Sequence, residues 1–210
     1  MVVSISILVT LYMVMLGPFK LIGPFYINTL HADKNLKRKI ALKAVVLSTV
    51  VSFIIVAIGG YLTARLNLSL DVLTILMGFL MGHWSVQNAL AKPGQSIKPP
   101  ENPTIDLAIF PVAMPEIIPP QAIALLILSS NIHVDEMANK MGSLMTIGLV
   151  ILGVMVLNWL AMITAPALMK FPVFWGVVAR IVAVLLAAVS LQLILSGLNS
   201  MGLISVIFNN

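Results

Sequence analysis

The sequence contains no cysteine, which excludes disulfide bonds, thiolate metal sites and cysteine nucleophiles. Charge is also scarce, because Asp, Glu, Lys and Arg make up 9% of the 210 residues, against about 25% in soluble domains. Hydrophobic residues make up 60% of the chain. In a soluble protein of this length, so few polar residues could not form a surface around a core that large. The composition therefore excludes most soluble folds and predicts a protein that is surrounded by lipid.

The sequence also lacks the motifs of common enzyme classes. It contains no HExxH, GxSxG or Walker A motif and no Gly-rich dinucleotide loop. We therefore expect no enzyme activity and no cofactor, and an intramembrane enzyme is the least favoured alternative. The first residues carry no basic region and no small-residue cleavage site, so they predict a spanning helix and not a signal peptide. The 13 methionines are interpreted as packing residues and not as metal ligands.

Six stretches are long and apolar enough to cross the hydrocarbon core of a bilayer, which takes about 20 helical residues. They cover residues 4–30, 45–64, 72–91, 107–130, 141–169 and 181–198. None shows the alternation of polar and apolar residues that is typical of barrel strands. The sequence thus predicts an all-α integral membrane protein with six transmembrane helices.

The basic residues favour one orientation of these helices. Nine Lys or Arg residues fall in the connections after the first, third and fifth spans, whereas only Arg65 and Lys140 fall in the opposite connections. Cytoplasmic loops are enriched in Lys and Arg, so both termini are predicted to lie outside, in a multi-pass protein of the inner membrane. The net charge of +5 is explained by this topology, and nucleic acid is not expected as a partner.

The six spans divide into two groups of three around a segment rich in Pro and Gly. We expect a first repeat over residues 1–91, a cytoplasmic linker over 92–104 and a second repeat over 105–210. Because each repeat has an odd number of spans, the second is inverted relative to the first. Inverted repeats of this kind are a common plan of secondary transporters.

Two predicted helices contain proline clusters at corresponding places in the two halves. The clusters comprise Gly17, Pro18, Lys20, Gly23 and Pro24 in the first helix, and Pro115, Glu116, Pro119, Pro120 and Gln121 in the fourth. Proline removes a backbone donor and clashes with the preceding turn, so both helices should unwind there. Unwound backbone at membrane depth is tolerated where it is buried in protein or lines a cavity. These ten residues form the candidate binding site, and a pair of packing kinks is the alternative.

Lys20 and Glu116 are the charged residues deepest in the predicted spans, and they occupy matching positions. A lone charge at membrane depth costs about 3 kcal/mol or more. If the two broken helices face each other, an ion pair between these residues can offset that cost. In the alternative, Lys20 extends to the inner surface and Glu116 lies near a helix end.

Several other polar or small residues lie within the spans. Gly78 and Gly82 are spaced for close helix packing, and His83 is expected to form a hydrogen bond between helices. The remaining candidates for interhelical contacts or solute binding are Gln87, Asn88, Asn158 and Gln192. The tryptophans are expected to include anchors at the membrane interface, and they are Trp84, Trp159 and Trp175.

The stretch FPVAMP over residues 110–115, the order of six spans and the proline-broken first helix resemble the MarC family. This family is the NAAT group of neutral amino acid transporters within the wider LysE superfamily, and its fourth helix typically reads PLAMP or PLAIP. The sixth span, with Arg180, Gln192 and Gly197, and the LSL stretch over residues 68–70 are also similar to the family pattern. The likeness covers nearly the whole chain, and the stretch in the fourth helix is its most specific part.

The chain departs from the family pattern at both breaks. Gly17 stands where the family usually has Asn or Asp, and Lys20 stands where it has a small or hydroxylated residue. Glu116 replaces a residue like Ser or Thr, and PPQ over residues 119–121 replaces GPG. The resemblance implies a transporter or exporter of a small polar, amino-acid-like solute, with its site at the breaks. The alternative is a non-transporting subunit that scaffolds a larger membrane complex, and a homo-oligomer is also considered.

Overall fold

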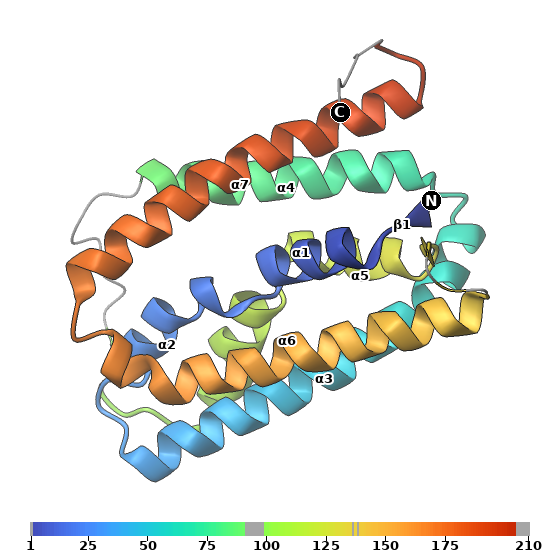
Figure 1. Cartoon of the computed structure of the whole chain (residues 1–210). Coiled ribbons are helices and arrows are strands. Elements are labelled where there is room, and N and C mark those ends of the chain that lie inside the picture. The colour runs from blue at the N-terminus through green and yellow to red at the C-terminus, as the bar shows by residue number, and fades with distance from the viewer. Residues whose placement is uncertain (1, 91–98, 136, 138, 205–210) are drawn as a thin grey trace.

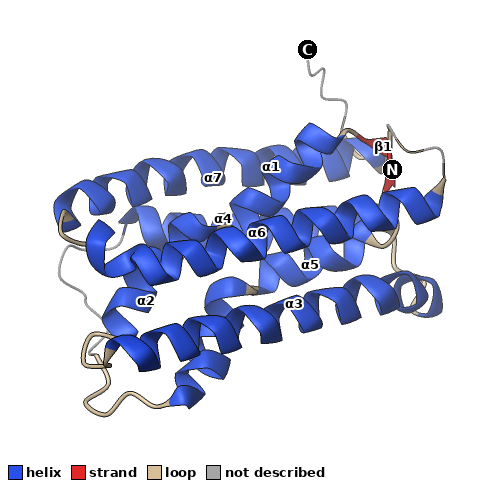
Figure 2. Ribbon diagram, turned by 60° about the horizontal axis from the view of Figure 1, so that its bottom comes forward, coloured by secondary structure: helices blue, strands red, loops and turns tan. Residues whose placement is uncertain are grey.

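The structure is a computed structural model, and it describes residues 2–90, 99–135, 137 and 139–204. The described residues are almost entirely helical (Figure 2). A two-residue parallel pairing joins β1 (Val2–Val3) to β2 (His133–Val134). Most of the predicted linker, including Lys92 and Lys98, lies outside the described residues.

The first predicted span forms as three short pieces. α1 (Ile5–Met15) is followed by the 3-10 turn η1 (Pro18–Lys20) and by α2 (Ile22–Asn28). Gly17 is extended between the first two pieces, where a Cβ atom would lie 1.8 Å from the carbonyl oxygen of Met13. Because no side chain fits there, glycine is required at this position. The predicted break in the first helix is confirmed.

Two long helices complete the first half. α3 (Lys34–Arg65) begins well before the predicted apolar span, because the side chain of Asp33 accepts a 2.9 Å hydrogen bond from the backbone N–H of Leu36. This N-cap makes the basic segment part of the helix. α4 (Leu70–Leu90) follows after a short turn.

The second half repeats the order of a broken helix and two long ones. η2 (Ile105–Ala108) and η3 (Ile109–Ile117) precede α5 (Pro120–Ser129), and the direction changes by 69° at the break between η3 and α5. Inside η3, Phe110 and Met114 have extended backbone angles and no helical geometry. The predicted break in the fourth helix is therefore also confirmed.

The last two helices are α6 (Lys140–Leu168) and α7 (Pro172–Ser200). The side chain of Asn139 accepts a 2.8 Å hydrogen bond from the N–H of Gly142 at the start of α6. Arg180, which the sequence pattern placed in the connection before the sixth span, lies inside α7. The sixth helix thus begins about two turns earlier than predicted, because Pro172 is accommodated in its first turn.

Four helices in the described part of the chain are long and apolar enough to cross a membrane, or five if the bent pair counts as one span. The four run over residues 5–28, 34–65, 140–168 and 172–200. α4 is formed over 21 residues but is not among them, since Asp71, His83, Gln87 and Asn88 make it more polar. An all-helical protein with several membrane-spanning helices is thus confirmed, whereas the number of six is not.

The helices pack in pairs (Figure 1). α4 packs along α7, α3 packs along α6, and the broken helices lie between these two pairs. A Cβ atom on Gly78 would lie 2.8 Å from the carbonyl oxygen of Ser190, and one on Gly197 would lie 3.0 Å from that of Asp71. The predicted close packing at Gly78 is therefore observed, with α7 as the partner helix.

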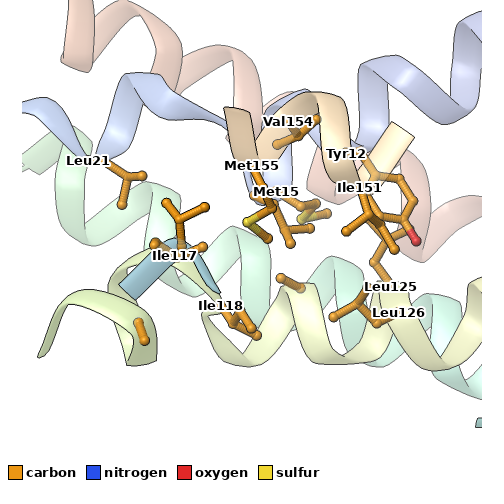
Figure 3. Packing of buried hydrophobic residues seen from close by; sticks show 14 of the residues in the cluster. Tyr12, Met15, Leu21, Ile117, Ile118, Leu125, Leu126, Ile151, Val154 and Met155 are labelled. Carbon is orange, nitrogen blue, oxygen red and sulfur yellow. The ribbon is translucent and has the colours of Figure 1, made fainter. Parts of the chain in front are cut away.

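The core lies where the broken helices meet α6. Figure 3 shows Met15 and Tyr12 of α1, Ile117 of η3, and Ile151 and Met155 of α6 in this region. All five side chains are at most 2% exposed. Such tight packing around unwound backbone excludes lipid from its polar groups, as membrane burial requires.

Candidate functional site

A cavity of about 660 Å³ lies between the two broken helices. Eight of the ten predicted site residues line it, namely Gly17, Lys20, Gly23, Pro24, Pro115, Glu116, Pro119 and Pro120. Pro18 is half-buried at the start of η1 and Gln121 is buried at the start of α5, and neither of the two lines the cavity. The volume lies within the range of about 300–1,000 Å³ that is usual for small-molecule sites.

The rest of the cavity wall comes from α1, η1, α2, α4, α7 and the turn before α7, and it is mostly apolar. α7 supplies the largest share, from Pro172 to Val189, and α4 supplies Trp84 and Asn88. Trp175 also lines the cavity, so two of the tryptophans expected at the membrane interface face the candidate site. A solute in this cavity would contact mainly hydrocarbon and aromatic groups.

Lys20 joins the two breaks. Its Nζ donates one hydrogen bond to the carbonyl oxygen of Met15 and another, of 3.2 Å, to that of Ile117. Met15 precedes the break in the first helix, and Ile117 precedes the break in the fourth. The ammonium group therefore satisfies one carbonyl at each break.

Glu116 is held by a hydrogen bond from α2. Asn28 Nδ2, at the end of α2, donates a 2.8 Å hydrogen bond to Glu116 Oε1. Glu116 Oε2 is buried and has no hydrogen-bond partner in the part of the chain that the structure describes. A carboxylate that accepts one hydrogen bond and lines a largely apolar cavity still has capacity for a further donor.

Lys20 and Glu116 line the same cavity but form no direct ion pair among the described residues. The hypothesis of directly paired charges is corrected in this respect, because Lys20 is engaged by two carbonyl oxygens and Glu116 by Asn28. The two opposite charges are still close, since Lys20 is bonded to the residue that follows Glu116. Their attraction offsets part of the desolvation of each without contact.

Asn158 of α6 binds a free carbonyl group at the break in the first helix. Its Nδ2 donates a 2.7 Å hydrogen bond to the carbonyl oxygen of Leu16, whose helical donor is lost at the break. The expectation of an interhelical contact is confirmed for Asn158. It is wrong for His83, whose side chain is exposed and lies 2.9 Å from Gln87 on the same helix.

A set of polar contacts joins the two halves at the other end of the broken helices. Tyr12 Oη donates a 2.9 Å hydrogen bond to Ser129 Oγ, and both residues are fully buried. Asn131 Nδ2 donates to Thr63 Oγ1 at 3.2 Å, and the pairing of β1 with β2 lies at the same end (Figure 1). The cavity wall extends the other way, to Asn88 and to Met169 in the turn between α6 and α7.

The sequence pattern does not single out Asn28, although this residue holds Glu116. Its only signal is an amide near the end of a predicted span, four residues after Pro24. Among the described residues, no group of three or more His, Asp or Glu side chains is arranged to hold a metal ion.

The long apolar helices and the core closed around two broken helices define a multi-pass helical membrane protein with a central cavity. Residues 1–202 match the family described as MarC family integral membrane protein, and the chain belongs to this family. No curated protein and no solved structure matches the chain.

Proposed function

We propose that the protein is an inner-membrane transporter or exporter of small amino-acid-like solutes, which bind in the cavity between the broken helices. The observation that carries this proposal is Glu116, a carboxylate that lines a largely apolar cavity and keeps one buried oxygen without a partner. An unpaired polar group in such surroundings is costly, so a ligand that donates a hydrogen bond to it is favoured. An ammonium group supplies both the donor and the opposite charge.

Lys20, the other charged residue of the cavity, can bind the carboxylate of an amino acid. A lysine ammonium has three donors, and Lys20 uses two of them on backbone carbonyls. The third can bind a carboxylate while the solute's ammonium binds Glu116. The aromatic and aliphatic wall, with Trp84 and Trp175, then favours an apolar side chain.

The pairing of the helices supports transport by alternating access. α3 packs on α6 and α4 on α7, so that each long helix of residues 1–91 packs against its counterpart in residues 105–210. This arrangement fits two inverted three-helix repeats with a site at their interface, joined by the linker over residues 92–104. The α3–α6 pair and the α4–α7 pair, each with one helix from either half, can then move as two bodies around a fixed site.

The distribution of basic residues suggests that the cavity extends toward the cytoplasmic side of the membrane. The basic start of α3 and the turn that holds Lys170 lie at the end toward which the cavity extends (Figure 1). By the positive-inside rule this end is cytoplasmic and both termini lie outside. The contact of Tyr12 with Ser129 would then close the outer path, in an inward-facing state.

The test is uptake of radiolabelled amino acids into proteoliposomes by wild type, by Glu116→Gln and by the control Glu101→Gln. Glu101 is an exposed acid outside the cavity. We expect wild type and the control to transport at least one apolar amino acid, and Glu116→Gln to lose most of that transport while remaining folded. If folded wild type transports no amino acid and purifies with a stoichiometric membrane partner, the proposal fails in favour of the scaffold subunit.

A further inference from the structure

A second hollow lies on the outer surface of α3, away from the cavity. This groove has a volume of about 630 Å³, and its wall consists of Lys39, Leu42, Lys43, Val46, Leu47, Val50, Ile105 and Ile109. The last two residues belong to η2 and η3, which pack against α3. The groove is therefore formed between α3 and the η2–η3 segment, in which Glu116 also lies.

Charge and hydrophobicity are separated along this groove. Lys39 and Lys43 are one helical turn apart at its basic end, and Val46 and Val50 continue the same face of α3. From Lys43 to Val50 the helix rises about 10 Å, at 1.5 Å per residue. A ligand that fits has an anionic head and an apolar chain at least this long.

Among the described residues the groove lysines have no acidic partner, which leaves them able to bind an anion. Five basic residues fall in the first ten positions of α3, namely Lys34, Lys37, Arg38, Lys39 and Lys43. The positive end of the macrodipole disfavours the cations of the first turn, Lys34 and Lys37, and its effect falls off before Lys39 and Lys43. Among the described residues, no acidic side chain forms an ion pair with Lys39 or Lys43. η2, which packs against α3, carries Asp106, and this side chain is exposed and bonded to Thr104.

We propose that this groove is a binding site for an anionic glycerophospholipid. The lipid phosphate contacts Lys39 and Lys43, and one acyl chain lies along Leu42, Val46 and Val50 and against Ile109. Basic pockets at the cytoplasmic ends of membrane helices are known to bind anionic head groups. The proposal concerns a site separate from the solute cavity and does not depend on transport.

The test is native mass spectrometry of the purified protein with phosphatidylglycerol or phosphatidylcholine of equal chain length. Lys39→Gln/Lys43→Gln is compared with Lys34→Gln/Lys37→Gln, which removes the same charge outside the groove wall. We expect wild type and the control pair to prefer phosphatidylglycerol, and the first pair to lose about tenfold to thirtyfold in its affinity, from two lysine contacts. Equal losses in both pairs would show diffuse attraction of surface charge and overturn the site.

A second variant tests the apolar part of the groove while it keeps both lysines. Val46→Trp should fill the groove and abolish the preference for phosphatidylglycerol. The control Leu149→Trp, at an exposed position of α6 outside the groove, should retain it. Melting temperatures show whether each variant is folded. Equal binding of the two lipids by wild type, or unchanged binding by Val46→Trp, would contradict the proposal.

Discussion

Replacing Lys20 by Met removes the ammonium group that joins the two breaks and keeps an unbranched apolar side chain. The substitution leaves the carbonyl oxygens of Met15 and Ile117 without the donor that they have in the wild type. It also removes the positive charge that faces the same cavity as Glu116. Both effects destabilise the folded protein.

The size of the effect follows from these contacts. A hydrogen bond from a charged donor contributes about 1.5–3 kcal/mol, and Lys20 makes two. Loss of one partner of a buried charge pair costs about 3–5 kcal/mol, which is similar to the sum of the two hydrogen bonds. For a chain of this size, a loss of about 3–5 kcal/mol lowers the melting temperature by about 6–20 °C.

The assay is thermal unfolding in detergent, followed by tryptophan fluorescence, for Lys20→Met, Glu116→Gln and the double variant. Glu116→Gln should lower the melting temperature less than Lys20→Met, since an amide oxygen can still accept from Asn28 and Lys20 keeps both of its carbonyl partners. The double variant should recover only part of the loss, because the carbonyls of Met15 and Ile117 stay unpaired. Full recovery would indicate a direct ion pair instead. A Lys20→Met protein that melts within about 2 °C of wild type would refute the reasoning.

Three further predictions concern packing, site support and topology. Gly78→Val should lower stability by about 1–3 kcal/mol through overpacking against α7, whereas Gly153→Ala, where a Cβ meets nothing within 4 Å, should not; equal melting curves would contradict this. Asn28→Ala should weaken solute binding more than folding, because Glu116 loses its one hydrogen-bond donor, and unchanged binding would argue against this support. In this cysteine-free chain, Cys at Asn67 should react with impermeant thiol reagents in intact cells and Cys at Asn35 should not; the reverse pattern would invert the topology.

The two breaks could be predicted from the sequence, because they follow from proline chemistry alone. Pro18 and Pro119 have no backbone N–H to continue a helix, whatever surrounds them. The start of α3 and the place of Arg180 could not be predicted from hydropathy. A helix continues past its apolar stretch when a cap such as Asp33 stabilises its end, and hydropathy does not detect that cap.

The contacts of the site residues depend on helix rotation, which the sequence does not determine. Lys20 lies in η1 and Glu116 in η3, at the two breaks, but their partners come from elsewhere in the chain. Asn28 lies 88 positions from Glu116 in the chain, and Asn158 lies 142 positions from Leu16. A shift of one residue in helix register would change both contacts, so only the structure identifies them.

The most direct test of the solute site is a double cycle between Glu116 and the solute ammonium group. Equilibrium binding of leucine and of its des-amino analogue, 4-methylpentanoate, is measured for wild type and for Glu116→Gln. If the ammonium group binds Glu116, wild type should bind leucine more tightly than the analogue, and Glu116→Gln should bind the two nearly equally. Equal preference for leucine in both proteins, or no binding of leucine by folded wild type, would contradict the account.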